Sequence, residues 1–261
     1  MNTLLVPVGS PKKALNTLQY AIDLVEGTQV KIYLVKAYGV TKVAGSLKNM
    51  DAFMEAEADH DLENVIAHVD KKGIEIISKS IGGSAKDIIK RVAKQLKIDL
   101  IVAGSNSDSK IFIGKTPGYL IKNTDLPVLF VPRNYPFKKI NTVLMTIKSG
   151  VISRENLLLP LHKIMNLHNS KLELLRVITP KSTDEDGNLD ATLNELLTNY
   201  STSKNETIYE GLKESIDKIS PDLICVIRRK RGFFKRLWAN DKVYKKDFES
   251  DLPLLVLKGS E

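Results

Sequence analysis

Asp99-Leu-Ile-Val-Ala-Gly104 is followed by Asp125-Leu-Pro-Val-Leu-Phe-Val131, and the same order returns in Asp222-Leu-Ile-Cys-Val-Ile227 and Asp251-Leu-Pro-Leu-Leu-Val-Leu257. Each copy holds a short apolar strand, a loop with a helix, and a second apolar strand entered through Asp-Leu-Pro. Solenoid units repeat every 20–50 residues or so, and this period is much longer. The sequence therefore predicts a duplicated domain.

Apolar stretches of strand length alternate with helical patterns in both halves of the chain. In the first half they cover residues 4–8, 30–35, 74–78, 98–103 and 128–131. Strands that alternate with helices form parallel sheets with right-handed crossovers and helices on both faces. The predicted fold class is α/β, with two tandem five-stranded parallel sheets. In the second half, residues 179–205 are polar and shorter than their counterpart, and a third strand is hard to find there.

The length of 261 residues suits two domains. We expect one domain over residues 1–134, a second over 139–261 with a shortened middle region, and a linker over 132–140 that contains Pro132 and Pro136. The apolar runs are far shorter than the roughly 20 residues that span a bilayer, and the N-terminus is interpreted as a strand and not as a signal peptide. We therefore expect a cytoplasmic protein, in which Cys225 is an inert buried thiol.

The segment Gly83-Ser-Ala-Lys-Asp-Ile-Ile89, which precedes the strand at Asp99, and the two Asp-Leu-Pro endings resemble the universal stress protein (UspA-like) family in its tandem form. The resemblance implies Rossmann-like domains that act as a binding or regulatory module in the stress response, without catalytic residues or metal ligands. It also implies that strands 128–131 and 254–257 pair within the chain as a pseudo-dimer. A homodimer and an unknown protein partner stay open.

ATP-binding members of that family have an acidic residue after the first strand, which holds the adenosine end. They also have a glycine loop, G-x2-G-x9-G-[S/T], after the fourth strand, where backbone N–H groups and a helix N-terminus cradle phosphates. In the first copy Gly9 stands at the acid position. Gly104 and Gly114 match the first and last glycines, and Lys115 and Thr116 follow. Both loops are about three residues short, so the resemblance implies a degraded nucleotide site here.

The second copy keeps the loop length but not the glycines. Ile227, Lys230 and Asn240 occupy their positions, and Lys148 stands where the acid is expected. A β-branched residue opposes both a positive φ and the close approach of a phosphate. We therefore expect no nucleotide site in domain 2 and no required cofactor. The first alternative is an ATP or adenine-nucleotide switch that uses domain 1 alone.

The net charge of +8 is concentrated between residues 228 and 246, a segment that contains nine basic residues and one acidic residue. The candidate anion-binding residues are Arg228, Arg229, Lys230, Arg231, Lys235 and Arg236, interleaved with aromatic residues. Such a segment can bind phosphates while stacking on bases, or lie on an anionic membrane surface. It can equally pack its aromatic side chains onto the sheet while the cations stay solvated. Binding of a nucleic acid or membrane surface is the second alternative function.

One helical face, with Glu57, His60, Asp61, Asn64 and His68, could suggest a metal site. None of its acid–histidine spacings is diagnostic of metal binding. We interpret this face as solvated.

Overall fold

The computed structural model describes residues 1–39, 48–105, 115–147, 149–152, 156–180, 182, 187–228 and 251–259. They form two compact units that divide between Phe137 and Lys138. The domain boundaries expected at residues 134 and 139 stay a prediction, since compactness alone does not define where an independent domain ends.

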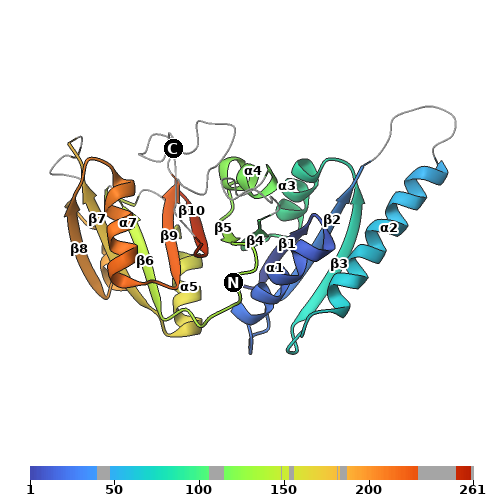
Figure 1. Cartoon of the computed structure of the whole chain (residues 1–261), viewed down its shortest axis with the longest axis horizontal. Coiled ribbons are helices and arrows are strands. Elements are labelled where there is room, and N and C mark those ends of the chain that lie inside the picture. The colour runs from blue at the N-terminus through green and yellow to red at the C-terminus, as the bar shows by residue number, and fades with distance from the viewer. Residues whose placement is uncertain are drawn as a thin grey trace. The chain divides into compact units, whose positions relative to one another are not determined.

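The first unit contains a five-stranded parallel sheet (Figure 1). Its strands lie in the order β3-β2-β1-β4-β5. They are β1 (Thr3–Val8), β2 (Lys31–Tyr38), β3 (Glu75–Gly82), β4 (Leu100–Gly104) and β5 (Val128–Val131). This sheet agrees with the predicted fold class.

Four helices connect these strands: α1 (Pro11–Leu24), α2 (Lys48–Ala67), α3 (Ala85–Gln95) and α4 (Lys115–Asn123). Helices α1 and α2 contact each other, as do α3 and α4. The strands β1, β2 and β3 follow one another toward one edge of the sheet. The chain then crosses back and adds β4 and β5 on the other side of β1. Because the crossovers are right-handed, this reversal puts the two helix pairs on opposite faces. The carboxyl ends of β1 and β4 thus meet at a topological switch point.

The second unit repeats this sheet with the order β10-β9-β6-β7-β8, again with parallel pairs. Its strands are β6 (Thr142–Ile147), β7 (Lys171–Ile178), β8 (Asn199–Lys204), β9 (Leu223–Arg228) and β10 (Leu254–Lys258). Its helices are α5 (Leu159–His168), α6 (Ala191–Leu196) and α7 (Ile208–Ile219). The two described units therefore share one topology, as the sequence repeat predicts.

Strand β8 is the element that the sequence pattern did not reveal. Its residues, Asn-Tyr-Ser-Thr-Ser-Lys, are nearly all exposed, and among the described strands its pairing partner is β7. An edge strand with little buried surface needs no apolar alternation, because backbone hydrogen bonds hold it in place. The shortened middle region of the second unit thus keeps a third strand while its helix α6 has only six residues.

The aspartates that open each repeat have a structural role. The Asp99 carboxylate accepts a hydrogen bond of 3.0 Å from the Thr3 N–H and another from the residue before it. The Asp222 carboxylate accepts a 3.0 Å bond from the Thr142 N–H and again one from the preceding residue. Each aspartate, just before the fourth strand of its unit, therefore holds the beginning of the first strand. This contact explains why the Asp-Leu-Ile stretch occurs twice.

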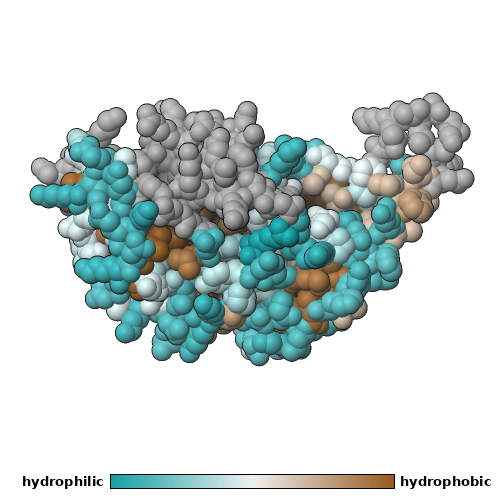
Figure 2. Space-filling view, viewed as in Figure 1, coloured by the Kyte–Doolittle hydropathy of each residue, from teal (hydrophilic) through white to brown (hydrophobic). Residues whose placement is uncertain are grey.

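The strand interiors form the cores, with Leu4, Leu5, Leu144 and Cys225 fully buried. Much of the surface turned to the viewer in Figure 2 is hydrophilic, including the outer side of α7. In the described part of the chain, none of the helices has the length and apolar character to cross a membrane. The cytoplasmic location, the pairing of strands 128–131 and 254–257, and the homodimer stay predictions.

Candidate functional site

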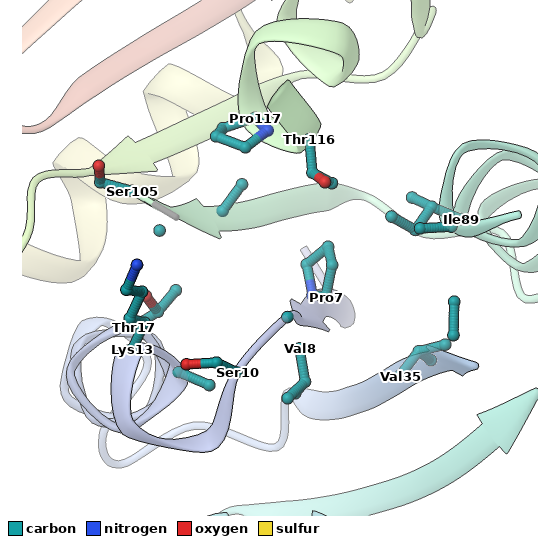
Figure 3. A pocket seen from close by; sticks show the side chains of 16 residues that line it. Pro7, Val8, Ser10, Lys13, Thr17, Val35, Ile89, Ser105, Thr116 and Pro117 are labelled. Carbon is teal, nitrogen blue, oxygen red and sulfur yellow. The ribbon is translucent and has the colours of Figure 1, made fainter. Parts of the chain in front are cut away.

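A cavity of about 130 Å³ opens at the switch point of the first unit. Its floor is formed by the carboxyl ends of β1, β2 and β4, including Val8, Val35 and Ala103. Figure 3 shows Ser10, Lys13 and Thr17 on the α1 side, and Thr116 and Pro117 on the α4 side. Crevices at this position of a doubly wound sheet are where such folds bind ligands.

The polar groups of this cavity suit an anion better than a cation. Its described lining contains the hydroxyl groups of Ser10, Thr17, Ser105 and Thr116 and the ammonium group of Lys13, but no carboxylate. Helices α1 and α4 both begin here, each with a proline in its first turn (Pro11 and Pro117), which suits a helix start. Their N-termini add partial positive charge. The Ser10 side chain makes no capping hydrogen bond with the described first turn of α1.

The backbone at the position where the resemblance implies an acid is bound by a lysine that is not itself among the lining residues of the cavity. Gly9 follows β1, and its carbonyl oxygen accepts a hydrogen bond of 3.0 Å from Lys36 Nζ. The same ammonium group pairs with the Asp61 carboxylate of α2. Lys36 reaches this point because β1 and β2 are in register, with Val8 opposite Lys36. Both side chains of the pair are mostly buried, 14% and 24% exposed.

Gly104 has a packing role that is independent of any ligand. A Cβ atom at this position would overlap the Thr17 hydroxyl and lie 3.1 Å from Thr17 Cβ. Thr17 is buried on α1, so the missing side chain at Gly104 lets α1 approach β4 closely. By contrast, a Cβ atom at Gly9 would meet nothing within 4 Å. The first glycine of the family pattern is therefore accounted for by helix packing.

The structure brings some of the predicted site residues together. Gly9, Gly104 and Thr116 line the same cavity, and Lys115 is exposed at the start of α4 beside it. Gly114 lies outside the described residues. Of the candidate anion-binding residues, Arg228 ends β9, while Arg229, Lys230, Arg231, Lys235 and Arg236 lie outside the described part.

At the corresponding edge of the second unit, Gly150 after β6 packs against the backbone that precedes α6. A Cβ atom at Gly150 would overlap the Asn188 carbonyl oxygen and lie 2.9 Å from Leu189 Cα. The Asp190 N–H donates a 3.1 Å hydrogen bond to the Gly150 carbonyl oxygen. Ile227, at the first glycine position, is buried. Lys148, at the acid position, lies outside the described residues.

Sequence reasoning missed three groups that line the cavity of the first unit: Ser10 as a lining hydroxyl, Lys13 and Thr17. It also missed Lys36, which binds the Gly9 backbone beside the cavity. It also interpreted the helix face that carries Asp61 as solvated, whereas Asp61 is paired with Lys36. Lys13 and Thr17 follow Ser10 at helical spacing, so the sequence alone could have predicted that both lie near the cavity. The Lys36 contact depends on the register of β1 and β2, which the sequence does not reveal.

A doubly wound parallel sheet with a cavity at its switch point defines the class of Rossmann-like α/β domains. Within this class, the model of the universal stress protein family matches residues 1–132. The chain therefore belongs to the universal stress protein family. Among curated proteins, none matches the chain closely enough to count as a relative.

Solved structures support the same fold. A universal stress protein from Archaeoglobus fulgidus is 16% identical, and the match covers 99% of this chain and 96% of that protein's chain with a TM-score of 0.68. A functionally unknown protein from Pseudomonas aeruginosa, 13% identical, matches 99% of this chain and 93% of its own with a TM-score of 0.59. These full-length matches agree with the tandem form. An AMP-bound universal stress protein from Arabidopsis thaliana, 21% identical, covers 51% of this chain and 93% of its own, but its TM-score of 0.37 is too low to carry its ligand over.

Proposed function

We propose that this tandem universal stress protein is a non-catalytic binding and regulatory module in the stress response. In this proposal the nucleotide site of domain 1 is degraded and domain 2 has none. The observation that carries it is that Gly9 stands where ATP-binding relatives have a carboxylate, so that the described lining of the cavity contains no carboxylate at this end.

The missing carboxylate changes what this end of the cavity can bind. A carboxylate accepts hydrogen bonds and can hold the hydroxyl groups of a ribose, whereas an ammonium group only donates. The Lys36 donors are already directed at Gly9 and Asp61, within a mostly buried ion pair. Moving Lys36 aside would leave the Asp61 carboxylate without this partner, which is costly for a group with little solvent access. Neither the cavity lining nor the Lys36–Asp61 pair beside it therefore offers a free carboxylate to hold an adenosine here.

The size of the cavity supports the same proposal. Pockets that bury a drug-sized ligand have volumes of about 300–1,000 Å³, and this cavity has about 130 Å³. A complete adenine nucleotide would therefore extend beyond this cavity.

One alternative has its own support. Gly104, Thr116 and the start of α4 line one cavity, as a phosphate site of the family would require. An ATP switch that uses domain 1 alone would follow if these groups still held the phosphates. That alternative predicts one nucleotide per chain, lost on Gly114→Val and unaffected by changes in domain 2.

Native mass spectrometry with ATP–Mg²⁺, ADP and AMP separates the two functions. We expect no bound nucleotide below about 1 mM, which corresponds to binding weaker than about −4 kcal/mol. The variant Gly9→Asp restores the acid of the family pattern at a position where a Cβ atom meets nothing within 4 Å, and it should increase AMP binding. Lys31→Met, which changes the net charge equally at the exposed start of β2, is the matched control. One nucleotide bound by the unaltered chain, lost on Gly114→Val and unaffected by changes in domain 2, would instead establish the ATP switch.

A further inference from the structure

The outer face of helix α3 carries an excess of positive charge. Between Ala85 and Lys97 the exposed side chains include one carboxylate, that of Asp87, and five cations. We call these cations the α3 basic row: Lys86, Lys90, Arg91, Lys94 and Lys97. The chain from β3 through α3 to β4 lies wholly within the described residues, so the balance of charge on this helix is complete.

The basic row runs along the helix. Lys86, Lys90 and Lys94 follow one another at four-residue spacing, so they lie on one side of α3, about 6 Å apart along its axis. Arg91 lies next to this line. The other side of the helix is apolar and buried, through Ile88, Ile89, Val92 and Ala93. The cations therefore point away from the core of the unit.

Only part of this charge has a structural reason. The Lys86 ammonium group lies 4.8 Å from the centre of the Tyr119 ring on the neighbouring helix α4, as a cation–π contact (Figure 1). Lys94 lies in the last turn of α3, where a cation complements the helix dipole. Within the described part of the chain, neither Lys90 nor Arg91 forms an ion pair with a carboxylate.

The row also has a cost for the helix. Lys90 is four residues from both Lys86 and Lys94, and like charges at this spacing destabilise a helix. Asp87, in the first turn, is the single acid of the helix. The spacing therefore weakens α3, and no described ion pair of Lys90 offsets the repulsion.

The second unit provides an internal comparison. Helix α7 connects the third and fourth strands of its unit, as α3 does in the first unit. From Ile208 to Ser220 it has two cations and three carboxylates, which are Lys213, Lys218, Glu210, Glu214 and Asp217. The two helices share a place in the fold but differ in charge, so the fold alone does not require the basic row.

A surface of this kind suits an anionic partner, and the residues narrow its chemistry. Helices that lie on a membrane insert an apolar face, whereas the apolar face of α3 is buried and Leu96, 37% exposed, is the large apolar exception in this described stretch. Proteins that bind single-stranded nucleic acids stack the bases on aromatic side chains, and residues 85–97 include no aromatic residue. Cations without such contacts match the phosphate backbone of a duplex.

We propose that the α3 basic row binds the phosphate backbone of double-stranded nucleic acid without reading its sequence. Helix α3 has 11 residues and is about 16 Å long. Over that length each strand of a duplex presents about five phosphates. The inference is independent of the nucleotide site in domain 1 and of the segment 228–246, because all five cations lie on α3 and the turn that follows it.

Fluorescence anisotropy of the full-length protein with labelled DNA and RNA duplexes of about 20 base pairs tests the proposal. At about 50 mM salt we expect micromolar binding that is equal for unrelated sequences and weakens steeply with salt. The duplex that binds more tightly identifies the kind of nucleic acid. The variant Lys90→Gln/Arg91→Gln/Lys94→Gln should weaken binding at least tenfold and lower the salt slope by about 2–3, as for three lost phosphate contacts.

The matched control removes three exposed lysines of the second unit and so changes the net charge equally. It is Lys171→Gln/Lys204→Gln/Lys218→Gln, and it should weaken binding less than about threefold. Equal weakening by both variants would show that the duplex responds to net charge and would overturn the proposal. The same holds if the unaltered chain binds neither duplex, or if the α3 variant keeps its duplex binding, whether or not it loses binding to vesicles that contain phosphatidylserine.

Discussion

The Gly104→Ala substitution tests whether the first glycine of the family pattern is kept for packing. The new Cβ atom would overlap the Thr17 hydroxyl and lie 3.1 Å from Thr17 Cβ and 3.4 Å from its Cγ2. Rotation of the threonine can move its hydroxyl group but not its Cβ atom, so α1 must shift away from β4. Added methyl groups in a well-packed core destabilise by about 1–3 kcal/mol. For a unit of this size, that corresponds to a fall in melting temperature of about 4–12 °C.

The assay is urea unfolding followed by circular dichroism, with calorimetry for the melting temperature, in the absence of any ligand. Gly9→Ala is the matched control, since a Cβ atom there meets nothing within 4 Å and the change should be neutral or slightly stabilising. Adding Thr17→Ala to Gly104→Ala should recover part of the loss, with a coupling energy of at least about 0.5 kcal/mol. A Gly104→Ala protein as stable as the unaltered chain, or a loss that Thr17→Ala leaves untouched, would refute the packing argument.

Three further predictions concern the second unit. Asp222→Ala should lower the free energy of unfolding by about 1.5–3 kcal/mol, as for a lost charge-assisted hydrogen bond, because the carboxylate holds the start of β6. Urea unfolding measures this loss, and a value under about 0.5 kcal/mol would contradict the assigned role. Burial raises the pKa of the Cys225 thiol, so it should stay unreactive to a thiol reagent in the native protein at pH 8 and react once unfolded. Since only the unfolded thiol ionises readily above about pH 8.5, stability should fall as the pH rises beyond that value, and Cys225→Ser should flatten the fall. Gly211→Ala should destabilise α7 by about 1–3 kcal/mol, because a Cβ atom would lie 2.8 Å from Val177 Cγ2; thermal melting of this variant beside Gly9→Ala provides the comparison.

Much of the fold could be predicted because its signals are local. The apolar strands, the prolines at helix starts and the repeated Asp-Leu stretches are each visible within a few residues, and they led to two parallel sheets. Strand β8 could not be predicted in this way, because an exposed edge strand such as Asn199–Lys204 carries no apolar pattern. Its place depends on hydrogen bonds with β7 and not on its own composition.

The candidate site was only partly predictable. Gly9, Gly104 and Thr116 lie around one cavity, as the family pattern implies. The Lys36–Asp61 pair joins residues from β2 and α2, and it arises from the pairing register and from helix packing. A lone lysine in a strand looks the same in a sequence whether it is solvated or directed into a site. Likewise, the packing reason for Gly104 requires the position of Thr17, which is far away in sequence.

The hydrogen bond between Asp99 and Thr3 also sets an order of events during synthesis. It joins residues that are 96 positions apart, and β1 gains its β4 neighbour at the same point. At a ribosomal rate of about 5–20 residues per second, the first strand of a nascent chain waits roughly 5–20 s before its fourth-strand partner has been made. During that interval the apolar β1 can pair only with β2, and its other edge is open to wrong partners. A slowed ribosome or a bound chaperone at this stage would therefore affect the yield of folded protein more than the final stability.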